Sequence, residues 1–200
     1  MSVTVLVGKE KHSFHLDKDQ LCKCSSFFDS ALRGGFEESK ELAVQLPEAD
    51  IEAFQVFEEW IVQCSVPEVE DWPKRSKRLV WLDKLEDIDF QLLYNSFLLV
   101  DFLQVSEFRR PLLNALISKQ KKIRIVPISL LPDIYENTLP GSPLRKIWIR
   151  WVIETPAPEI FEDGKWELPE EFLRELAAAQ TRYILRLTEM LGRSRPGELI

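Results

Sequence analysis

The chain has 200 residues with a net charge of −7, and 45% of its residues are hydrophobic. This apolar content, with six tryptophans and twelve phenylalanines, is enough for a folded core and argues against wholesale disorder. The acidic balance excludes a protein that is basic overall, so we expect no nucleic-acid partner. The sequence also contains no apolar run of about 18 residues, the length that predicts a membrane span, so we expect no membrane association.

The cellular compartment is indicated by the N-terminus and the cysteines. The first residues lack the basic and apolar regions of a signal peptide. Cys22, Cys24 and Cys64 are few and odd in number, which is typical of a reducing compartment. We therefore expect a cytoplasmic or nuclear protein.

The first third of the chain predicts three strands and three helices. Apolar residues alternate over 3–7 and 42–46, which is typical of strands, and a second strand around 12–15 completes a hairpin. A longer helix follows from 51, because its large apolar residues recur at spacings of three and four. They are Ile51, Phe54, Phe57, Trp60 and Ile61.

Polar residues and glycines predict where these helices begin and end. Asp17, Ser25 and Asp50 each precede a helical segment, and their side-chain oxygens can accept a hydrogen bond from a first-turn amide. Gly34 and Gly35 end the second short helix, since glycine tolerates the backbone geometry of a helix end.

The composition changes between residues 64 and 88, where prolines and mixed charges predict an insertion containing a short strand at 78–82. Helical periodicity returns over 89–104, and Ser106 is suited to cap the next helix. Pro111 fits that helix poorly unless it lies in or near the first turn, where its missing amide costs little.

Two further helices are predicted near the C-terminus. The first begins with Ser142 as cap and Pro143 at the first helical position, and it turns Trp148 toward the core. The second starts at Pro169 and ends at Gly192. Its expected apolar stripe consists of Leu173, Leu176, Ala177, Tyr183, Ile184, Leu187 and Leu191.

Several of these segments together resemble the BTB/POZ family, most closely its filamentous-fungal members with a helical extension. The similar segments are Phe14-His15 with Leu21 and Ser25-Ser26-Phe27-Phe28, the stretch Gly34-Gly35-Phe36-Glu37-Glu38-Ser39, Leu46-Pro47-Glu48, and Tyr94–Leu103. The last segment departs from the family pattern, because Val100 stands where alanine is usual.

The resemblance implies an α+β fold with a small, mostly antiparallel three-stranded sheet flanked by α-helices, followed by C-terminal helices. It covers about residues 3–120. We therefore expect a BTB/POZ-like domain at 1–121, interrupted by the insertion at 64–88, and a helical extension at 122–200.

The resemblance also implies function: such domains are protein–protein interaction modules, and some are adaptors that dock on a cullin-type ubiquitin ligase scaffold. Phe36 and Glu38 match the docking pattern of an apolar residue followed two positions later by glutamate. An exposed aromatic can fill a pocket while the carboxylate makes a polar contact at its rim. The competing interpretation is that Phe36 packs under the glycine turn.

An alternative function is an oligomerisation or scaffold module in a transcriptional or regulatory complex without a ligase link. Many dimeric BTB domains exchange an additional N-terminal helix and strand with their partner. The sequence starts directly at the first sheet strand, so a homodimer formed by this exchange is not favoured here.

Other candidate sites are weaker. Lys74, Arg75, Lys77 and Arg78 form a basic run that is typical of either a nuclear import signal or a solvated loop. His15 has no arrangement of nucleophile and acid around it that predicts catalysis, and we expect its ring to bond to the backbone. We expect no enzyme activity and no cofactor.

The cysteines and tryptophans have structural interpretations. Cys22 and Cys24, with His12 and His15 nearby, lack a second ligand cluster, so we expect buried thiols and no metal. Trp148, Trp151 and Trp166 could form an exposed aromatic groove, but a stripe at helical spacing more often belongs to the core.

Overall fold

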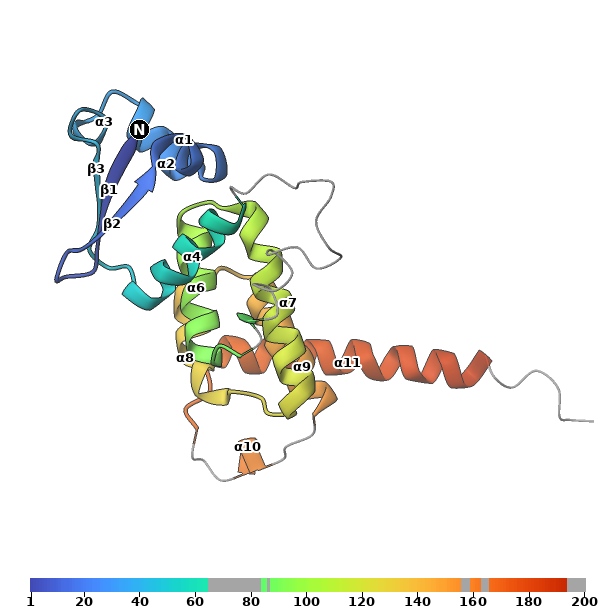
Figure 1. The fold of residues 1–200 in the computed structure, drawn as a ribbon. Coiled ribbons are helices and arrows are strands. Elements are labelled where there is room, and N and C mark those ends of the chain that lie inside the picture. Colours follow the sequence, from blue (N-terminus) through green and yellow to red (C-terminus); the bar gives the residue numbers. More distant parts are fainter. Residues whose placement is uncertain (65–83, 86, 156–158, 163–165, 194–200) are drawn as a thin grey trace, which may run out of the picture. The chain divides into compact units, whose positions relative to one another are not determined.

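The computed structural model describes residues 1–64, 84–85, 87–155, 159–162 and 166–193 (Figure 1). The chain divides into two compact units, Met1–Ile123 and Arg124–Ile200. The boundary falls two residues after the position expected from the sequence. The short strand expected at 78–82 and the basic run Lys74, Arg75, Lys77 and Arg78 lie outside the described residues.

Unit 1 contains a three-stranded sheet formed by β1 (Ser2–Val7), β2 (His12–Asp17) and β3 (Ala43–Leu46), in the order β2-β1-β3. β1 pairs antiparallel with β2 and parallel with β3. The α+β class is confirmed, but the sheet is mixed rather than mostly antiparallel. The physical reason is the helical connection between β2 and β3, which brings the chain back to the start of β1 and aligns the two strands.

Three short helices form this connection: α1 (Lys18–Cys24), α2 (Ser26–Arg33) and α3 (Glu37–Glu41). The predicted caps are confirmed at the first two. Asp17 Oδ1 accepts hydrogen bonds from the amides of Asp19 and Gln20, and Ser25 Oγ accepts one from Phe28 at 3.1 Å. The five-residue helix α3 was not predicted.

In unit 1, α4 (Ile51–Cys64) packs against α6 (Phe90–Phe102), and α6 packs against α7 (Ser106–Ile123). Phe54 of α4 contacts Phe14 of β2, which joins these helices to the sheet. Asp50 Oδ1 accepts from the Ala53 amide at 2.7 Å, so the predicted cap of α4 is confirmed. The aromatic stripe of α4 is buried, and Trp60 stacks on Phe108 of α7 with ring centroids 4.8 Å apart. This stacking joins α4 to α7 through the largest apolar groups of the unit.

Pro111 lies inside α7 and beyond its first turn, the position in which it fits a helix poorly. The helix begins at Ser106 itself, which moves Pro111 beyond the positions where an amide has no helical partner. The bond that Pro111 cannot make would have gone to the carbonyl of Glu107, four residues earlier. Glu107 is exposed, so water can satisfy that carbonyl.

Unit 2 consists of helices. They are the 3-10 helix η1 (Ile128–Leu130) and the α-helices α8 (Leu131–Asn137), α9 (Pro143–Glu154), α10 (Glu159–Glu162) and α11 (Glu170–Arg193). Ser142 Oγ accepts from the Leu144 amide at 3.3 Å, which confirms the predicted start of α9.

Trp148 and Trp151 belong to the core of unit 2. Both are buried, and their ring centroids are 4.6 Å apart. The indole Nε1 of Trp148 donates to the Pro127 carbonyl at 3.1 Å, so burial leaves this polar group satisfied. The exposed aromatic groove is therefore not formed by these residues, and Trp148 is buried as predicted.

Arg145 is a buried charged residue that connects three helices of unit 2. Its guanidinium donates to the carbonyls of Tyr135 and Thr138 and to Thr138 Oγ1, and it lies 4.3 Å from the centre of the Tyr135 ring. On α11, Nη1 forms an ion-pair contact with Glu171 Oε2 at 2.9 Å. Arg145 thereby holds the first turns of α11 against α8 and α9.

Candidate protein-interaction surface

The Ser-Ser-Phe-Phe motif fixes α2 against the end of α6. Ser25 Oγ donates to the Leu103 carbonyl and Ser26 Oγ to Gln104 Oε1, both at 2.6 Å. Phe28 of the same motif is completely buried. The motif that carries the family resemblance thus has a clear structural role: it joins two segments 78 residues apart in sequence.

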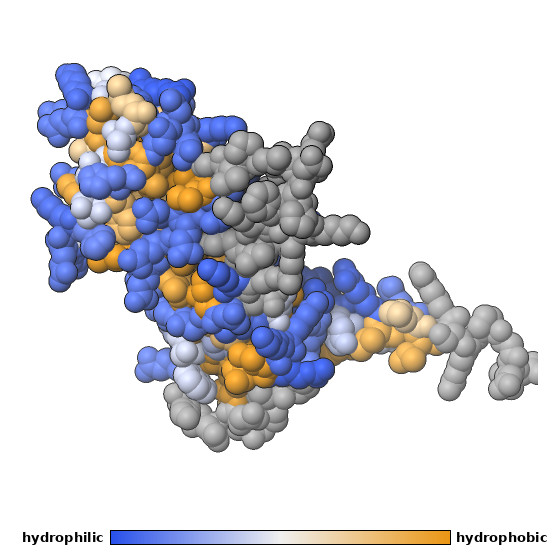
Figure 2. Space-filling model, viewed as in Figure 1, coloured by the Kyte–Doolittle hydropathy of each residue, from blue (hydrophilic) through white to orange (hydrophobic). Residues whose placement is uncertain are grey.

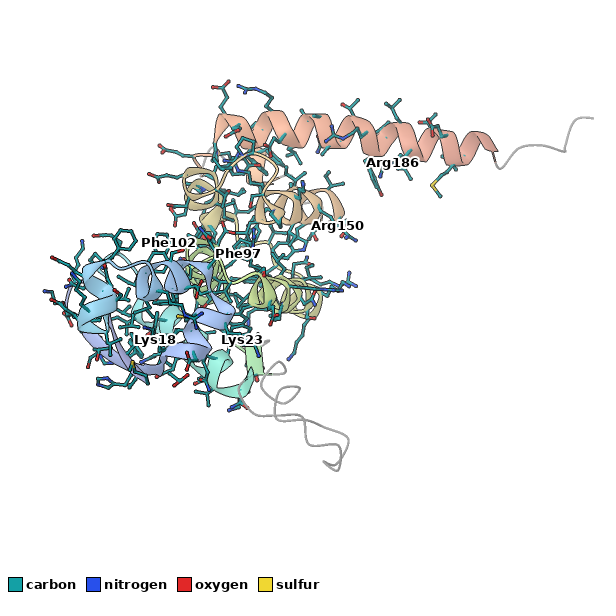
Figure 3. The ribbon with its side chains drawn as sticks, turned by 90° about the horizontal axis from the view of Figure 1, so that it is seen from above. Lys18, Lys23, Phe97, Phe102, Arg150 and Arg186 are labelled. Atoms are coloured by element: carbon teal, nitrogen blue, oxygen red, sulfur yellow. The ribbon has the colours of Figure 1, made fainter. Side chains whose placement is uncertain are left out.

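Phe27 and Phe102 extend this contact to the surface. Their rings are 5.2 Å apart, and Phe27 is half-buried whereas 60% of Phe102 is exposed. Figure 3 shows Phe102 at the edge of unit 1. An aromatic ring that is mostly exposed beside another is an uncommon feature on a surface that faces only water.

A second exposed aromatic lies at the other end of α2. Gly34 follows Phe27 by seven residues, so both lie on one face of α2, two turns apart. The ring of Phe36 lies against Gly34 so closely that a Cβ there would be 2.7 Å from Cε2 of Phe36. One edge of the ring packs on the glycine, yet 61% of Phe36 is exposed. We call Phe27, Gly34, Phe36 and Phe102 the α2 surface.

Glu38 stands in the first turn of α3, two residues after Phe36, and is partly exposed. Among the described residues, no hydrogen bond or ion pair engages its carboxylate. Ser39 instead closes the turn, because its hydroxyl donates to the Phe36 carbonyl at 2.7 Å. The carboxylate can therefore accept a hydrogen bond from a partner that covers Phe36.

His15 differs from its expected structural role. Its ring Nδ1 lies 3.3 Å from the hydroxyl of Thr4 on the neighbouring strand, and not against the backbone. The antiparallel register places Thr4 opposite His15, on the exposed side of the sheet. The structure places no nucleophile–acid pair around this ring among the contacts that it describes.

Cys22 and Cys24 point their thiols at different backbone groups. Cys22 lies near the Phe28 carbonyl at 3.8 Å and Cys24 near that of Leu21 at 3.4 Å. Burial raises the pKa of the Cys22 thiol, which disfavours the thiolate that a metal would need. Within the described ranges, no group of three or more His, Cys, Asp or Glu side chains is suited to hold a metal ion.

The burial of Cys22 gives a testable expectation. At neutral pH, a thiol-specific alkylating agent should modify Cys24 several times faster than Cys22. The reactive species is the thiolate, and the Cys22 thiol is buried and has a raised pKa. Peptide mapping by mass spectrometry after short exposures measures both rates. Equal rates in the folded protein would contradict the described packing of α1.

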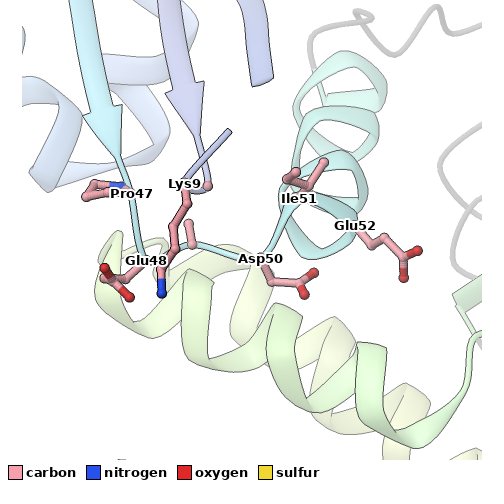
Figure 4. A pocket seen from close by; sticks show the side chains of 8 residues that line it. Lys9, Pro47, Glu48, Asp50, Ile51 and Glu52 are labelled. Carbon is pink, nitrogen blue, oxygen red and sulfur yellow. The ribbon is translucent and has the colours of Figure 1, made fainter. Parts of the chain in front are cut away.

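An open hollow lies beside the turn after β1 and the segment that joins β3 to α4. Figure 4 shows Lys9 reaching toward this segment, which carries Glu48 and Asp50, and Glu52 follows in the first turn of α4. Asp50 already serves the fold, since its two carboxylate oxygens accept from the Ala53 amide and from Asn95 Nδ2. In Figure 4 the carboxylates of Glu48, Asp50 and Glu52 do not converge on a common point.

Phe102 was missed by sequence reasoning. The stripe predicted over 89–104 contains Phe97 and Val100, and Phe102 lies off that stripe. A large aromatic residue outside the inward face of a helix is the signal that could have identified it. Phe36, in contrast, was selected by its motif.

Comparison with known proteins adds no assignment. No family model matches the chain, and no curated protein sequence matches it. Among the described residues, no helix combines the length and the apolar composition needed to cross a membrane.

Proposed function

We propose that this chain is a protein–protein interaction module that docks through the α2 surface, with the N-terminal domain of a cullin-type scaffold as the partner. The observation that carries the proposal is the exposure of Phe36 and Phe102 by about 60% each, the first against Gly34 and the second against Phe27 of α2. The BTB/POZ-like motifs supply the class of partner. In this function the chain is an adaptor, which is the role that those motifs imply.

The two aromatic residues suit the centre of an interface. Truncation of buried aromatic residues at interfaces commonly costs 2 kcal/mol or more, which is about thirtyfold in affinity. Phe36 can be held in position because its ring edge packs on Gly34. A side chain that is already ordered loses less conformational entropy when a partner covers it. Glu38 supplies the polar contact at the rim.

The test is a binding titration of the full chain with the purified N-terminal domain of a cullin. We expect Phe36→Ala to weaken binding at least tenfold, because the exposed ring is lost while the core is untouched. Glu38→Lys should weaken binding and make it respond differently to salt, since it reverses the charge at the rim. Circular dichroism and light scattering on each sample establish that the variants are folded and of the same mass.

Lys9→Ala is the matched control, because Lys9 is exposed at the β1–β2 turn, at the opposite end of the sheet from α3 (Figure 1). Its affinity should equal that of the wild type. Failure of folded wild-type protein to bind would overturn the ligase-scaffold proposal. A dimer of wild-type protein that Phe36→Ala converts to a monomer would instead assign the α2 surface to self-association.

A further inference from the structure

The second half of α11 differs from the first in its surroundings. Phe172 and Leu176 are buried in unit 2, and Phe172 contacts Tyr135 with ring centroids 5.7 Å apart. Every residue from 180 to 191 is exposed. Figure 3 shows the helix continuing past the rest of unit 2. We call residues 180–191 the distal half of α11.

The distal half is apolar around most of its circumference. Leu187 follows Tyr183 by four residues, and Ile184, Leu187 and Leu191 recur at spacings of three and four, so these residues form one broad stripe. Leu185 lies about 100° further round than Ile184 and is 58% exposed. Figure 2 shows apolar side chains on the visible face of this part of the helix.

The threonines of this segment add to its apolar character. Thr181 Oγ1 donates to the Ala177 carbonyl at 2.9 Å, and Thr188 Oγ1 donates to the Ile184 carbonyl at 3.0 Å. Because both hydroxyl protons are used within the helix, neither side chain needs water as an acceptor. Both threonines lie between the broad stripe and Leu185 on the helix, so from residue 181 onward an arc of more than half the circumference is suited to burial; Gln180 lies on this arc at its N-terminal end.

The remaining ridge is basic. Arg182 and Arg186 are four residues apart and therefore lie on the same side of the helix. Within the part of the chain that the structure describes, neither guanidinium is held in an ion pair. Glu189 is the acidic residue of the segment, which is thus locally basic in a chain of net charge −7. Carboxylates on a partner would complement this ridge.

These features disfavour a second copy of the chain as the occupant. The segment is roughly 18 Å long at ~1.5 Å per residue. Two such helices side by side bury on the order of several hundred Å², below the approximately 1,200 Å² of a stable interface. A flat contact through the broad stripe would also leave Leu185 uncovered.

A membrane surface is disfavoured for a related reason. A helix that lies in the lipid interface has a broad polar face turned to water and an apolar face turned to lipid. Here Arg182, Arg186 and Glu189 form a narrow polar ridge, and Gln180, the first residue of the segment, lies outside it. A groove that encloses the helix covers the whole apolar arc, as grooves on helix-binding proteins do.

We propose that the distal half of α11 is a recognition helix that inserts into an apolar groove rimmed by carboxylates on a partner protein. Tyr183, Ile184, Leu185 and Leu187 fill the groove, and Arg182 and Arg186 meet its acidic rim. This site lies in unit 2 and is separate from the α2 surface, so the chain has two interaction sites.

Calcium-loaded calmodulin is a suitable probe, because it presents an apolar groove that binds amphipathic helices and loses this groove without calcium. We expect the full chain to bind it in a fluorescence anisotropy titration with a Kd in the micromolar range. Leu187→Asp should weaken binding at least tenfold, and the double variant Arg182→Glu, Arg186→Glu should weaken it and reduce its salt dependence. Leu139→Asp is the matched control, since Leu139 is 81% exposed in unit 2 outside α11.

Four results would overturn the proposal. They are no binding by folded wild-type chain, binding that persists when calcium is removed, equal binding by Leu187→Asp, and equal loss in Leu139→Asp. Two parallel measurements identify the other occupants. A mass that doubles with concentration and is restored to a monomer by Leu187→Asp would assign the segment to a second copy. Tighter binding to phosphatidylcholine–phosphatidylserine vesicles than to calmodulin would assign the distal half of α11 to membranes.

Discussion

Arg145→Ala is expected to reduce the free energy of unfolding of unit 2 by about 3 kcal/mol, the cost typical of breaking a buried charged network. Only 2% of Arg145 is exposed. The substitution leaves the Tyr135 and Thr138 carbonyls without their donor and removes the cation between two glutamates of α11. Because Glu171 and Glu175, one turn apart on α11, then lose their shared cation, α11 should be released from α8 and α9.

The same network keeps the Tyr135 hydroxyl protonated. Burial, and then its hydrogen bond to Glu175 at 2.9 Å, raise the pKa of Tyr135. The hydroxyl therefore remains a donor to Glu175 throughout the neutral range. A phenol in this position cannot replace the charge that Arg145 supplies, so Arg145→Ala is not compensated locally.

Urea unfolding followed by tryptophan emission measures this effect. Arg150→Ala is the control, because Arg150 lies on the exposed side of α9 and pairs with Glu154 four residues later, an interaction of about 0.5 kcal/mol. Arg145→Lys should recover only part of the stability, since a lysine ammonium lacks the planar fork that reaches several acceptors. A loss for Arg145→Ala no larger than that of Arg150→Ala would contradict the proposed role of Arg145.

Ser25→Ala is expected to destabilise unit 1 by about 2 kcal/mol, because it removes a helix cap and leaves a buried carbonyl without a donor. Ser25 is almost fully buried, and its hydroxyl accepts from the Phe28 amide and donates to the Leu103 carbonyl. The loss should also loosen α2 from the end of α6 and so weaken docking through Phe27 and Phe102.

Ser26→Ala is a control from the adjacent position. Ser26 is exposed, and its hydroxyl bonds to the side chain of Gln104 rather than to a buried carbonyl. Its replacement should change the unfolding free energy by about 0.5 kcal/mol or less. Thermal or urea unfolding of both variants distinguishes them, and equal stability of the two would show that Ser25 does not hold α2 in place.

Local signals explain what the sequence predicted well. Asp17, Ser25 and Asp50 were recognised as caps because a capping side chain and its target amide lie within three residues of each other. The alternation of β1 was equally visible, since Val3, Val5 and Val7 all turn to the core. Each of these features depends on neighbours in the chain.

Features that depend on distant contacts were not predicted. The parallel pairing of β1 with β3 follows from how the chain returns through α1 to α3, which periodicity within a strand does not encode. In α11 the predicted stripe included Leu173 and Leu176. Leu176 is buried, but Leu173 is 41% exposed and Phe172, which was not part of the prediction, is buried in its place. Packing against α8 and α9 selects which edge of a broad stripe is buried.

The candidate site shows the same division. The motif identified Phe36 and Glu38, but the neighbouring exposed ring of Phe102 is placed by the contact between α2 and the end of α6. The close approach of Phe36 to Gly34 also depends on how the chain turns after α2. The α2 surface combines residues as far apart in sequence as Phe27 and Phe102, so it could not be predicted from the sequence alone.

Photocrosslinking from the α2 surface tests the central proposal most directly. The variants Phe36→p-benzoylphenylalanine and Phe102→p-benzoylphenylalanine keep an aromatic ring at each position, and the same substitution at Lys9 is the control at the far end of the sheet. With the N-terminal domain of a cullin as partner, we expect crosslinks from positions 36 and 102 and none from position 9. Binding without crosslinks from position 36 or 102, or equal crosslinking from all three, would contradict docking through this surface.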